Sequence, residues 1–469
     1  MHVLVLGAGM VGSVAAADLA ATPGFHVTVV DAGAPAIERA KRRVATAVAG
    51  AAAGAVAGAR TPSGAPVRPH ARFIVDDAGG ARQVRALVRR LKPDLVLGAL
   101  PSRFGFEVMA AVIAERVPYV DISFMPEDFR EHDRAARRAG VPVVADCGVA
   151  PGMSNMLAGW AARTLDRCDT IEILVGGLPR TRHWPWQYKA PFSHHDVIEE
   201  YVRPSRMVEH GKVVVREALS DPELVTLPGV GTLEAFYTDG LRSLADTLKV
   251  PNMREKTMRW PGHAELMRTL RHLGLFSHEH VQVGDARVRP IDLTAKLLFP
   301  HWTYEEGEPD VTVMTVRAWG SRGGRDVRMA WTLHDELDPA TGFPSMSRTT
   351  AFPATSVLRL IAAGRIAKPG VHAPEMLAAM PGILDAVLAD QRARGVHYKP
   401  WMEETAPARR AKATKRAPAA KSAPPAKRAP AAKRAPAKKR APVTKSAPAA
   451  KRAPAPKSAS VTPARRTRR

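Results

Sequence analysis

Three glycines close to the start of the chain have the spacing that lets a backbone hold phosphate groups. Gly7, Gly9 and Gly12 follow a short apolar run and precede a helix-forming segment. In such a unit the first glycine permits the tight turn, the second lets the backbone approach a pyrophosphate, and the third lets the helix pack against the strand. The helix that opens at Met10 and Val11 also points its unpaired N–H groups and its positive dipole end at the phosphates. These five residues predict a dinucleotide site.

An aspartate indicates which dinucleotide is preferred. Asp31 ends the apolar run 26–30 and lies nineteen residues after Gly12. A carboxylate at this distance can accept hydrogen bonds from both hydroxyls of the adenosine ribose. It would also repel a 2′-phosphate, so we predict NAD rather than NADP as the cofactor.

The elements that must position these residues alternate regularly in the first third of the chain. Strand-like apolar runs lie at 2–6, 26–31, 72–75, 94–97, 119–122 and 141–144, and helix-forming segments lie near 81–91, 106–115 and 127–138. Short continuous apolar strands between amphipathic helices favour a parallel sheet buried on both faces. The predicted fold class is therefore α/β, with a Rossmann domain at residues 1–150 built as a doubly wound parallel sheet.

Ligands of such sheets bind beyond the carboxyl ends of the strands. At those ends the sequence places Gly7, Asp31, Asp76, residues 98–101, residues 121–124 and residues 146–148. We therefore add Asp76 and Gly148 to the predicted cofactor contacts. Two interpretations of the segment 146–155 stay open, a crossover into the next domain and a loop against the nicotinamide.

From about residue 151 the pattern changes. Strands are expected at 171–175, 212–215, 311–316 and 326–333, the last two as a hairpin across 320–324, and helices near 264–272, 347–363 and 378–394. These segments indicate a second α/β domain with a mixed or antiparallel sheet. We expect a substrate-binding domain at 151–345, helices returning to the Rossmann domain at 346–403, and a separate tail at 404–469.

Two segments gather residues suited to acting on a substrate. Residues 186–196 hold Tyr188, Lys189, Ser193, two histidines and an acid. Partial desolvation lowers the pKa of a lysine, so Lys189 could hold a carboxylate or move a proton. The adjacent histidines lack a matching third ligand, and no metal site is predicted.

The second segment, residues 252–265, is rich in charged and aromatic residues. If it is extended, Thr257 and Arg259 share one face. The guanidinium groups of Arg259 and of Arg203 are suited to an amino-acid carboxylate. The alternative is a solvated charged hairpin.

Five dispersed motifs make the chain resemble the saccharopine dehydrogenase family, and within it most of all the lysine 6-dehydrogenase branch. They are residues 7–12, residues 146–152, Tyr188 and Lys189 with Ser193, residues 257–263 and residues 346–354. The resemblance covers about residues 1–400. It implies a Rossmann domain with an inserted substrate domain, a homodimer formed through residues 151–345, and oxidation or reductive formation of a C–N bond on a lysine-derived amino acid.

The resemblance also implies roles for single residues. Leu100 and Pro101, in the loop 98–101, and Ser123 would border the nicotinamide and the substrate. Arg203, Thr257 and Arg259 would hold the substrate, together with Tyr188 and Ser193, which fall in a matching motif.

Three residues depart from the saccharopine reductases. Gly98 and Ala150 stand where those enzymes usually carry a serine and an acid, and Asp31 departs from their preference for NADP. These departures point away from saccharopine itself as the substrate.

The resulting hypothesis is an NAD-linked amino-acid dehydrogenase. The substrate amine must be neutral before hydride leaves, so a base is needed, with Lys189 and Asp121 as candidates. One alternative is a related synthase that reductively joins another amine and aldehyde, such as a polyamine. Another is a non-catalytic nucleic-acid-binding protein with a dehydrogenase-derived body.

Positive charge is concentrated at the C-terminus. Residues 405–469 contain 21 lysines and arginines and no acid, and they account for all but +3 of the formal net charge of +24. From residue 415 a lysine recurs every sixth residue, usually followed three positions later by proline, and bulky apolar residues are absent. This pattern is typical of a disordered, polyproline-like tail and resembles linker-histone tails. We expect it to bind nucleic acid or another polyanion without base specificity.

The two cysteines, Cys147 and Cys168, favour a reducing compartment and no disulfide framework. The first strand begins at residue 2, which leaves no room for a signal peptide, and no apolar run reaches the roughly 18 residues of a membrane span. We expect a cytoplasmic protein without membrane partners, associated with the nucleoid if its tail binds DNA.

Overall fold

Two β-sheets organise the part of the chain that the computed structural model describes, residues 1–54 and 70–405. Contacts gather residues 1–410 into one compact unit. The division of this unit at residues 150 and 345 stays a prediction. The first two residues of the predicted tail, 404 and 405, belong to a strand, and the rest of the tail lies outside the described residues. In the described residues, no helix combines the length and the apolar character that crossing a membrane requires.

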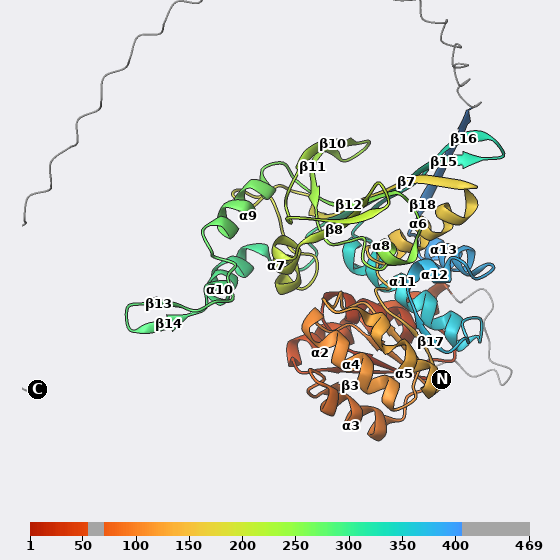
Figure 1. The fold of residues 1–469 in the computed structure, drawn as a ribbon. Coiled ribbons are helices and arrows are strands. Elements are labelled where there is room, and N and C mark those ends of the chain that lie inside the picture. Colours follow the sequence, from red (N-terminus) through yellow and green to blue (C-terminus); the bar gives the residue numbers. More distant parts are fainter. Residues whose placement is uncertain (55–69, 406–469) are drawn as a thin grey trace, which may run out of the picture. The chain divides into compact units, whose positions relative to one another are not determined.

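The first sheet is the predicted doubly wound sheet, with seven parallel strands in the order β17-β6-β5-β4-β1-β2-β3 (Figure 1). Its strands are β1 (His2–Leu6), β2 (His26–Asp31), β3 (His70–Val75), β4 (Leu95–Gly98), β5 (Tyr119–Asp121), β6 (Pro142–Val144) and β17 (Gly370–His372). Its helices are α1 (Met10–Ala20), α2 (Ala34–Gly54), α3 (Ala81–Leu91), α4 (Ser102–Ala114) and α5 (Asp133–Ala139). Alternate residues of β1 enter two different apolar clusters, one on each face of the sheet. The predicted fold class is confirmed.

Two details of this sheet differ from the sequence expectation. The segment expected as one helix at 127–138 begins as a 3₁₀ turn, Phe129–His132, because Asp128 caps it by accepting a hydrogen bond from the backbone N–H of Arg130 at 3.0 Å. Strand β17 was not expected, since three residues carry too little pattern. It enters from the far end of the chain and pairs with β6.

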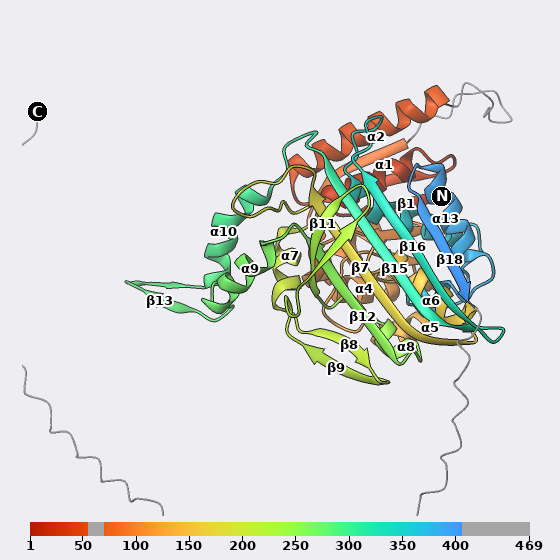
Figure 2. The same cartoon turned by 90° about the horizontal axis from the view of Figure 1, so that it is seen from above.

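The second sheet has nine strands and is mixed, as expected. Its main path is β10-β11-β12-β7-β15-β16-β18, with β8 pairing β12 and β9. The strands are β7 (Arg167–Pro179), β8 (Ser205–Glu209), β9 (Lys212–Arg216), β10 (Glu223–Leu227), β11 (Gly231–Tyr237), β12 (Asn252–Arg259), β15 (Asp310–Arg322), β16 (Arg325–Glu336) and β18 (Tyr398–Thr405). Figure 2 shows β7, β15 and β16 running side by side. The predicted hairpin between β15 and β16 turns at Gly323 and Gly324, whose positive φ angles of 57° and 74° suit a two-residue turn.

The remaining elements surround the second sheet or return to the first. They are α6 (Met153–Thr164), α7 (His194–Val202), α8 (Leu244–Thr247), α9 (His263–His272), the hairpin β13 (Val281–Val283) and β14 (Ala286–Val288), α10 (Pro290–Trp302), α11 (Ser345–Ala362), α12 (Pro374–Leu377) and α13 (Ile383–Ala393). Helix α11 packs on α1, where buried Asp18 accepts hydrogen bonds from Arg359 at 2.6 Å and Arg394 at 2.5 Å. These contacts fix helix α1 against the C-terminal helices.

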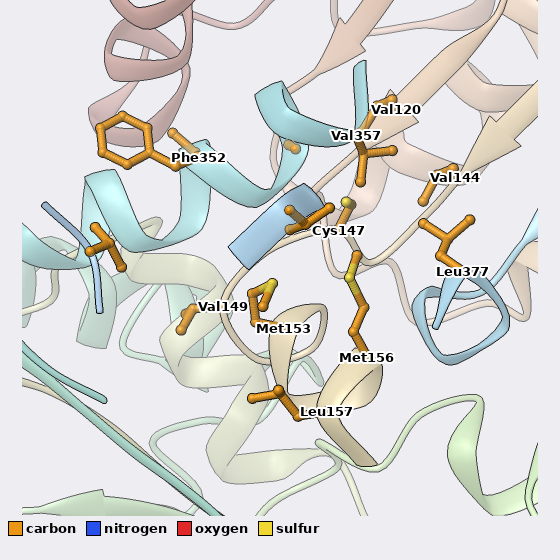
Figure 3. Packing of buried hydrophobic residues seen from close by; sticks show 14 of the residues in the cluster. Val120, Val144, Cys147, Val149, Met153, Met156, Leu157, Phe352, Val357 and Leu377 are labelled. Carbon is orange, nitrogen blue, oxygen red and sulfur yellow. The ribbon is translucent and has the colours of Figure 1, made fainter. Parts of the chain in front are cut away.

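A buried apolar cluster supports the loop between the two sheets. Figure 3 shows Cys147, Val149, Met153 and Met156 packed against Val357 and other side chains of α11 and α12. Cys147 and Cys168 are both buried and unpaired with one another. The loop 146–152 is therefore held from behind by core packing, which leaves its other side to face a cavity.

Candidate active site

A cavity of about 410 Å³ lies between the carboxyl ends of the parallel strands and one part of the mixed sheet. The Rossmann side contributes Gly7, Gly9, Met10, Val11, Asp31, Arg39, Leu100, Pro101, Ser123, Phe124, Asp146 and Gly148. The opposite side contributes Gly176, Gly177, Ser193, Asp196, Glu200, Thr257, Arg259, Met346 and Thr350. Twelve predicted site residues thus surround one space, although they are up to 252 positions apart in the sequence.

The glycine turn has the shape that a phosphate-bearing ligand needs. A Cβ on Gly7 would lie 2.4 Å from the carbonyl oxygen of Ala99, and a Cβ on Gly12 would lie 2.1 Å from the carbonyl oxygen of Gly7. A Cβ on Gly9 would meet no atom within 4 Å, and Gly9 lines the cavity. Gly7 and Gly12 therefore hold the turn together, whereas Gly9 keeps space open at the start of α1.

Asp31 stands beside this turn and is fixed by two backbone amides. Its Oδ2 accepts a hydrogen bond from the N–H of Ala8 at 2.6 Å, and its Oδ1 accepts one from the N–H of Gly33 at 2.7 Å. Arg39 of α2 lines the same end of the cavity, and its Nε is buried without a hydrogen-bond partner. This end thus offers an oriented carboxylate and an arginine with unused donor capacity.

A buried carboxyl lies directly behind Ser123. The Oδ1 of Asp121 accepts hydrogen bonds from the N–H and the hydroxyl of Ser123, at 2.8 and 2.6 Å, and its Oδ2 accepts one from the Tyr119 hydroxyl at 2.6 Å. Burial raises the pKa of Asp121 to about 6, against the lowering effect of these hydrogen bonds. A Cβ on Gly98 would lie 1.9 Å from the Tyr119 hydroxyl oxygen, so glycine at position 98 makes room for this arrangement.

The loop after β6 forms another wall. Asp146, at φ 50°, accepts a hydrogen bond from Arg242 Nε at 2.8 Å, while its Oδ1 is buried without a partner. Gly152, at φ 134°, closes the loop, because a Cβ there would lie 2.0 Å from the carbonyl oxygen of Gly148. The loop joins the two sheets, as the first interpretation of this segment expected, and it also lines the cavity. Its contact with a nicotinamide stays a prediction.

On the opposite wall, the extended strand β12 aligns Thr257 and Arg259 as expected. Arg259 is buried, and it donates hydrogen bonds to Glu200 at 3.0 Å, to the Tyr201 hydroxyl at 3.3 Å and to its neighbour's carbonyl. Its guanidinium lies 4.6 Å from the centre of the Tyr188 ring. The alternative interpretation of this segment, a solvated charged hairpin, is therefore wrong.

Helix α7 adds two carboxyl groups. Ser193 caps the helix, and Asp196 and Glu200, one turn apart, both face the cavity. Asp196 accepts a hydrogen bond from the Ser102 hydroxyl at 2.5 Å. Burial raises the pKa of both carboxyl groups, and Arg259 opposes this effect at Glu200.

Other predicted site residues do not line the main cavity. Arg203 lies 4.7 Å from the centre of the Phe124 ring and lines a neighbouring cavity of about 370 Å³. Tyr188 is buried beneath Arg259, and Gly12 and Asp121 lie behind the lining residues. Their assigned roles stay predictions.

Two further predicted residues, Lys189 and Asp76, also do not line the main cavity. Lys189 pairs with Glu308 at 2.5 Å and lines a third cavity. Asp76 pairs with Arg90 at 2.7 Å on the surface. The role of each likewise stays a prediction.

Sequence reasoning missed Glu200 and Arg39 as lining residues. Glu200 follows Asp196 by four positions, and this helical spacing could have identified it. Arg39 gave no comparable signal, because a charged residue in a helix is usually solvated.

Comparison with known families agrees with this geometry. The NADP binding domain of saccharopine dehydrogenase matches residues 3–144, and the saccharopine dehydrogenase C-terminal domain matches residues 148–396. The chain belongs to the saccharopine dehydrogenase family. The matching family domain of the first part of the chain is described as binding NADP, whereas the sequence prediction from Asp31 was NAD.

Individual relatives are distant. The chain is 29% identical over 203 residues to alpha-aminoadipic semialdehyde synthase of Rattus norvegicus, a match that covers 40% of this chain and 22% of the relative. The chain thus spans about a fifth of the length of that relative. It is 23% identical over 336 residues to carboxynorspermidine synthase of Vibrio cholerae, covering 63% of this chain and 78% of the relative.

Two solved structures share the fold. A saccharopine dehydrogenase (L-Glu forming) of Saccharomyces cerevisiae has a TM-score of 0.64 at 17% identity, covering 86% of this chain and 99% of the other. A homospermidine synthase of Legionella pneumophila in complex with NAD has a TM-score of 0.57 at 12% identity, covering 86% and 91%.

Proposed function

We propose that the protein is an NAD-linked oxidoreductase that breaks or forms a C–N bond of a lysine-derived amino acid. The observation that carries this proposal is the single cavity, which joins a dinucleotide turn at one end to Ser123, Thr257 and Arg259 at the other. A coenzyme and a polar substrate could therefore meet in one space, as a hydride transfer requires.

The residues present fit a nicotinamide dinucleotide. Gly9 leaves open the space that a pyrophosphate needs, and the carboxylate of Asp31 is held where ribose hydroxyls would bind. When bound, the nicotinamide would supply the hydride acceptor or donor. The chain's own residues would bind and orient the substrate and move its protons.

Replacing Asp31 is expected to change the coenzyme preference. In Asp31→Ser the charged acceptor and its repulsion of a 2′-phosphate are both lost, and Arg39 at the same end of the cavity gains an opportunity to bind that phosphate. We expect NAD affinity to fall about 10-fold, or ~1.4 kcal/mol, and NADP affinity to rise. Titration calorimetry with both coenzymes measures this change. An unchanged ratio of the two affinities would show that Asp31 does not determine the coenzyme preference.

The two candidate bases occupy different places. Asp121 reaches the cavity through the Ser123 hydroxyl, and its pKa of about 6 leaves it ready to accept a proton at neutral pH. Lys189 instead pairs with Glu308 and lines another cavity. We therefore assign proton uptake on the Rossmann wall to Asp121.

The Lys189→Met variant tests this choice. We expect an unaltered pH profile of kcat and a loss of roughly 1–2 kcal/mol in the free energy of unfolding, because Glu308 loses its ion pair with Lys189. Steady-state rates across pH and a thermal melt measure the two effects. Loss of one limb of the pH profile in this variant would instead indicate that Lys189 is the base.

The proposed function is tested by incubating the purified protein with amino acids and polyamines in the presence of NAD or NADP. We expect reduced coenzyme to accumulate, measured by its absorbance, with a lysine-derived amino acid. Absence of turnover with every amine and both coenzymes would overturn the proposal.

A second candidate is a synthase that reductively joins a polyamine-type amine and an aldehyde. Two carboxyl groups, Asp196 and Glu200, face the cavity, and Glu200 already pairs with Arg259. This arrangement favours a substrate with an additional ammonium group over one with an additional carboxylate. Carboxynorspermidine synthase and homospermidine synthase among the similar proteins support it. The same amine panel separates the two candidates.

The tail carries a separate proposal. We infer that residues 405–469 bind nucleic acid or other polyanions, because this segment contains 21 lysines and arginines and no acidic residue. A chain ending at Glu404 should lose retention on DNA at low salt and keep its turnover. Equal retention of the two forms would exclude the tail from DNA binding and leave no support for a nucleic-acid-binding protein.

A further inference from the structure

A line of hydrogen bonds connects a buried carboxyl to the substrate end of the cavity. The Oε2 of Glu255 lies 2.7 Å from the Thr238 hydroxyl, and that hydroxyl lies 2.7 Å from the hydroxyl of Thr257. Thr257 lines the cavity. Glu255 and Thr257 occupy alternate positions of β12 and so share one face of the strand with Arg259.

Glu255 has an environment that disfavours its charged form. Its side chain is buried, and beyond the Thr238 hydroxyl the same oxygen accepts the N–H of Gly240 at 3.1 Å. The acids that act on it most are Glu200 of α7 and Asp239 of the segment after β11. Asp239 pairs with Arg206 at 3.2 Å and with Arg242 at 3.8 Å, and Arg259 lies on the same face of β12 as Glu255. Burial first, then these acids, raise the pKa of Glu255 to about 8 against the effect of its hydrogen bonds.

We propose that Glu255 exchanges protons with the substrate nitrogen through the hydroxyls of Thr238 and Thr257. This inference rests on the proposed function, and it makes Glu255 a positioning residue that acts through two others. Glu255 and the Asp121–Ser123 pair then exchange protons with the substrate from opposite walls of the cavity.

The proton transfer balances without another reactant. In the direction of oxidation, the substrate ammonium gives a proton to Thr257, Thr257 passes its own hydroxyl proton to Thr238, and Thr238 passes its own to Glu255. The ammonium becomes a neutral amine and the carboxylate becomes a carboxylic acid. In the direction of C–N bond formation the same line runs in reverse, because both hydroxyls can turn from donor to acceptor.

The sign of the pH dependence follows from this exchange. Below about pH 8 Glu255 holds its proton and can deliver it during reduction, and above that pH it can accept one during oxidation. The oxidation rate should therefore rise through pH 8 and the reduction rate should fall. Asp121, with its pKa of about 6, would give a separate limb at lower pH.

Two variants test this proton relay from Thr257 through Thr238 to Glu255, and two others serve as controls. Glu255→Gln preserves shape and hydrogen-bond capacity but has no titratable proton. Thr238→Val interrupts the line, and Thr238→Ser keeps the hydroxyl and serves as its matched control. Glu172→Gln controls for loss of a buried carboxyl, because Glu172 lies on the adjacent strand β7 and pairs with Arg254 and Arg317 instead of the relay.

Two readouts are needed, one of which is independent of turnover. In the protein without coenzyme, infrared difference spectra should contain a carboxylic-acid C=O band that titrates near pH 8 and is absent in Glu255→Gln. In steady-state oxidation, Glu255→Gln and Thr238→Val should each lose the limb near pH 8, with kcat lowered on the order of 100-fold. Thr238→Ser and Glu172→Gln should keep the limb, and Thr238→Val should keep the infrared band.

The outcomes separate the relay from the proposed function. A wild-type protein that turns over no amine overturns the proposed function and the relay with it. A wild-type protein that does turn over, but whose pH limb near 8 survives in Glu255→Gln or Thr238→Val, overturns the relay alone. The absence of a wild-type band titrating near pH 8 has the same consequence.

Discussion

The Gly9→Ala variant is expected to fold normally and to lose most of its affinity for the coenzyme. A Cβ at this position meets no protein atom within 4 Å, so the free energy of unfolding should be unchanged. The methyl group would instead occupy the open space that we assign to the pyrophosphate. Overpacking of this kind costs about 1–3 kcal/mol, equivalent to roughly 10- to 100-fold in affinity. Thermal melts and titration calorimetry measure the two quantities.

Two other glycines provide the controls. Gly50→Ala also enters open space, but in α2 away from the cavity, and it should keep both stability and binding. Gly12→Ala should lower stability by about 2 kcal/mol as well as binding, since its Cβ would lie 2.1 Å from a backbone oxygen. If Gly9→Ala binds the coenzyme as tightly as the wild type, the pyrophosphate does not lie where we place it.

The Arg259→Met variant is expected to have the second large effect. Arg259 is buried against Glu200, so its removal leaves a carboxyl without its partner and should cost about 3 kcal/mol of stability. We also expect kcat/KM to fall on the order of 100-fold, because a charged group that orients the substrate is lost. Chemical denaturation and steady-state kinetics measure the two losses.

A double variant distinguishes structural support from substrate binding. Arg259→Met combined with Glu200→Gln removes the unpaired charge, so stability should return while kcat/KM stays low. Arg254→Met is the matched control, because Arg254 lies on the other face of β12 and is half exposed. Recovery of activity together with stability in the double variant would contradict a substrate role for Arg259.

The coenzyme half of the site could be predicted from the sequence because its signals are local. The glycine turn, the apolar strand before it and the acid at Asp31 lie within one strand–helix–strand unit, whose geometry is fixed by short-range packing. Strand ends in a parallel sheet also meet at one edge, so Ser123 and Gly148 could be placed beside Gly7 without knowledge of long-range contacts.

The opposite wall of the cavity could be predicted only in part. Alternation along β12 was enough to align Thr257 with Arg259, but the parallel pairing of β12 with β7 depends on contacts about 80 positions apart. The same alternation extends to Glu255, which the sequence interpretation did not use. The positions of Arg203 and Lys189 depend on which neighbours they pack against, Phe124 in one case and Glu308 in the other, and no sequence pattern encodes those contacts.

Titration calorimetry of the purified full-length protein with NAD and NADP tests the central claim most directly. The account predicts saturable binding of NAD at one site per chain, weaker binding of NADP, and loss of NAD binding in Gly9→Ala. Absence of binding by either coenzyme to a folded protein would contradict it.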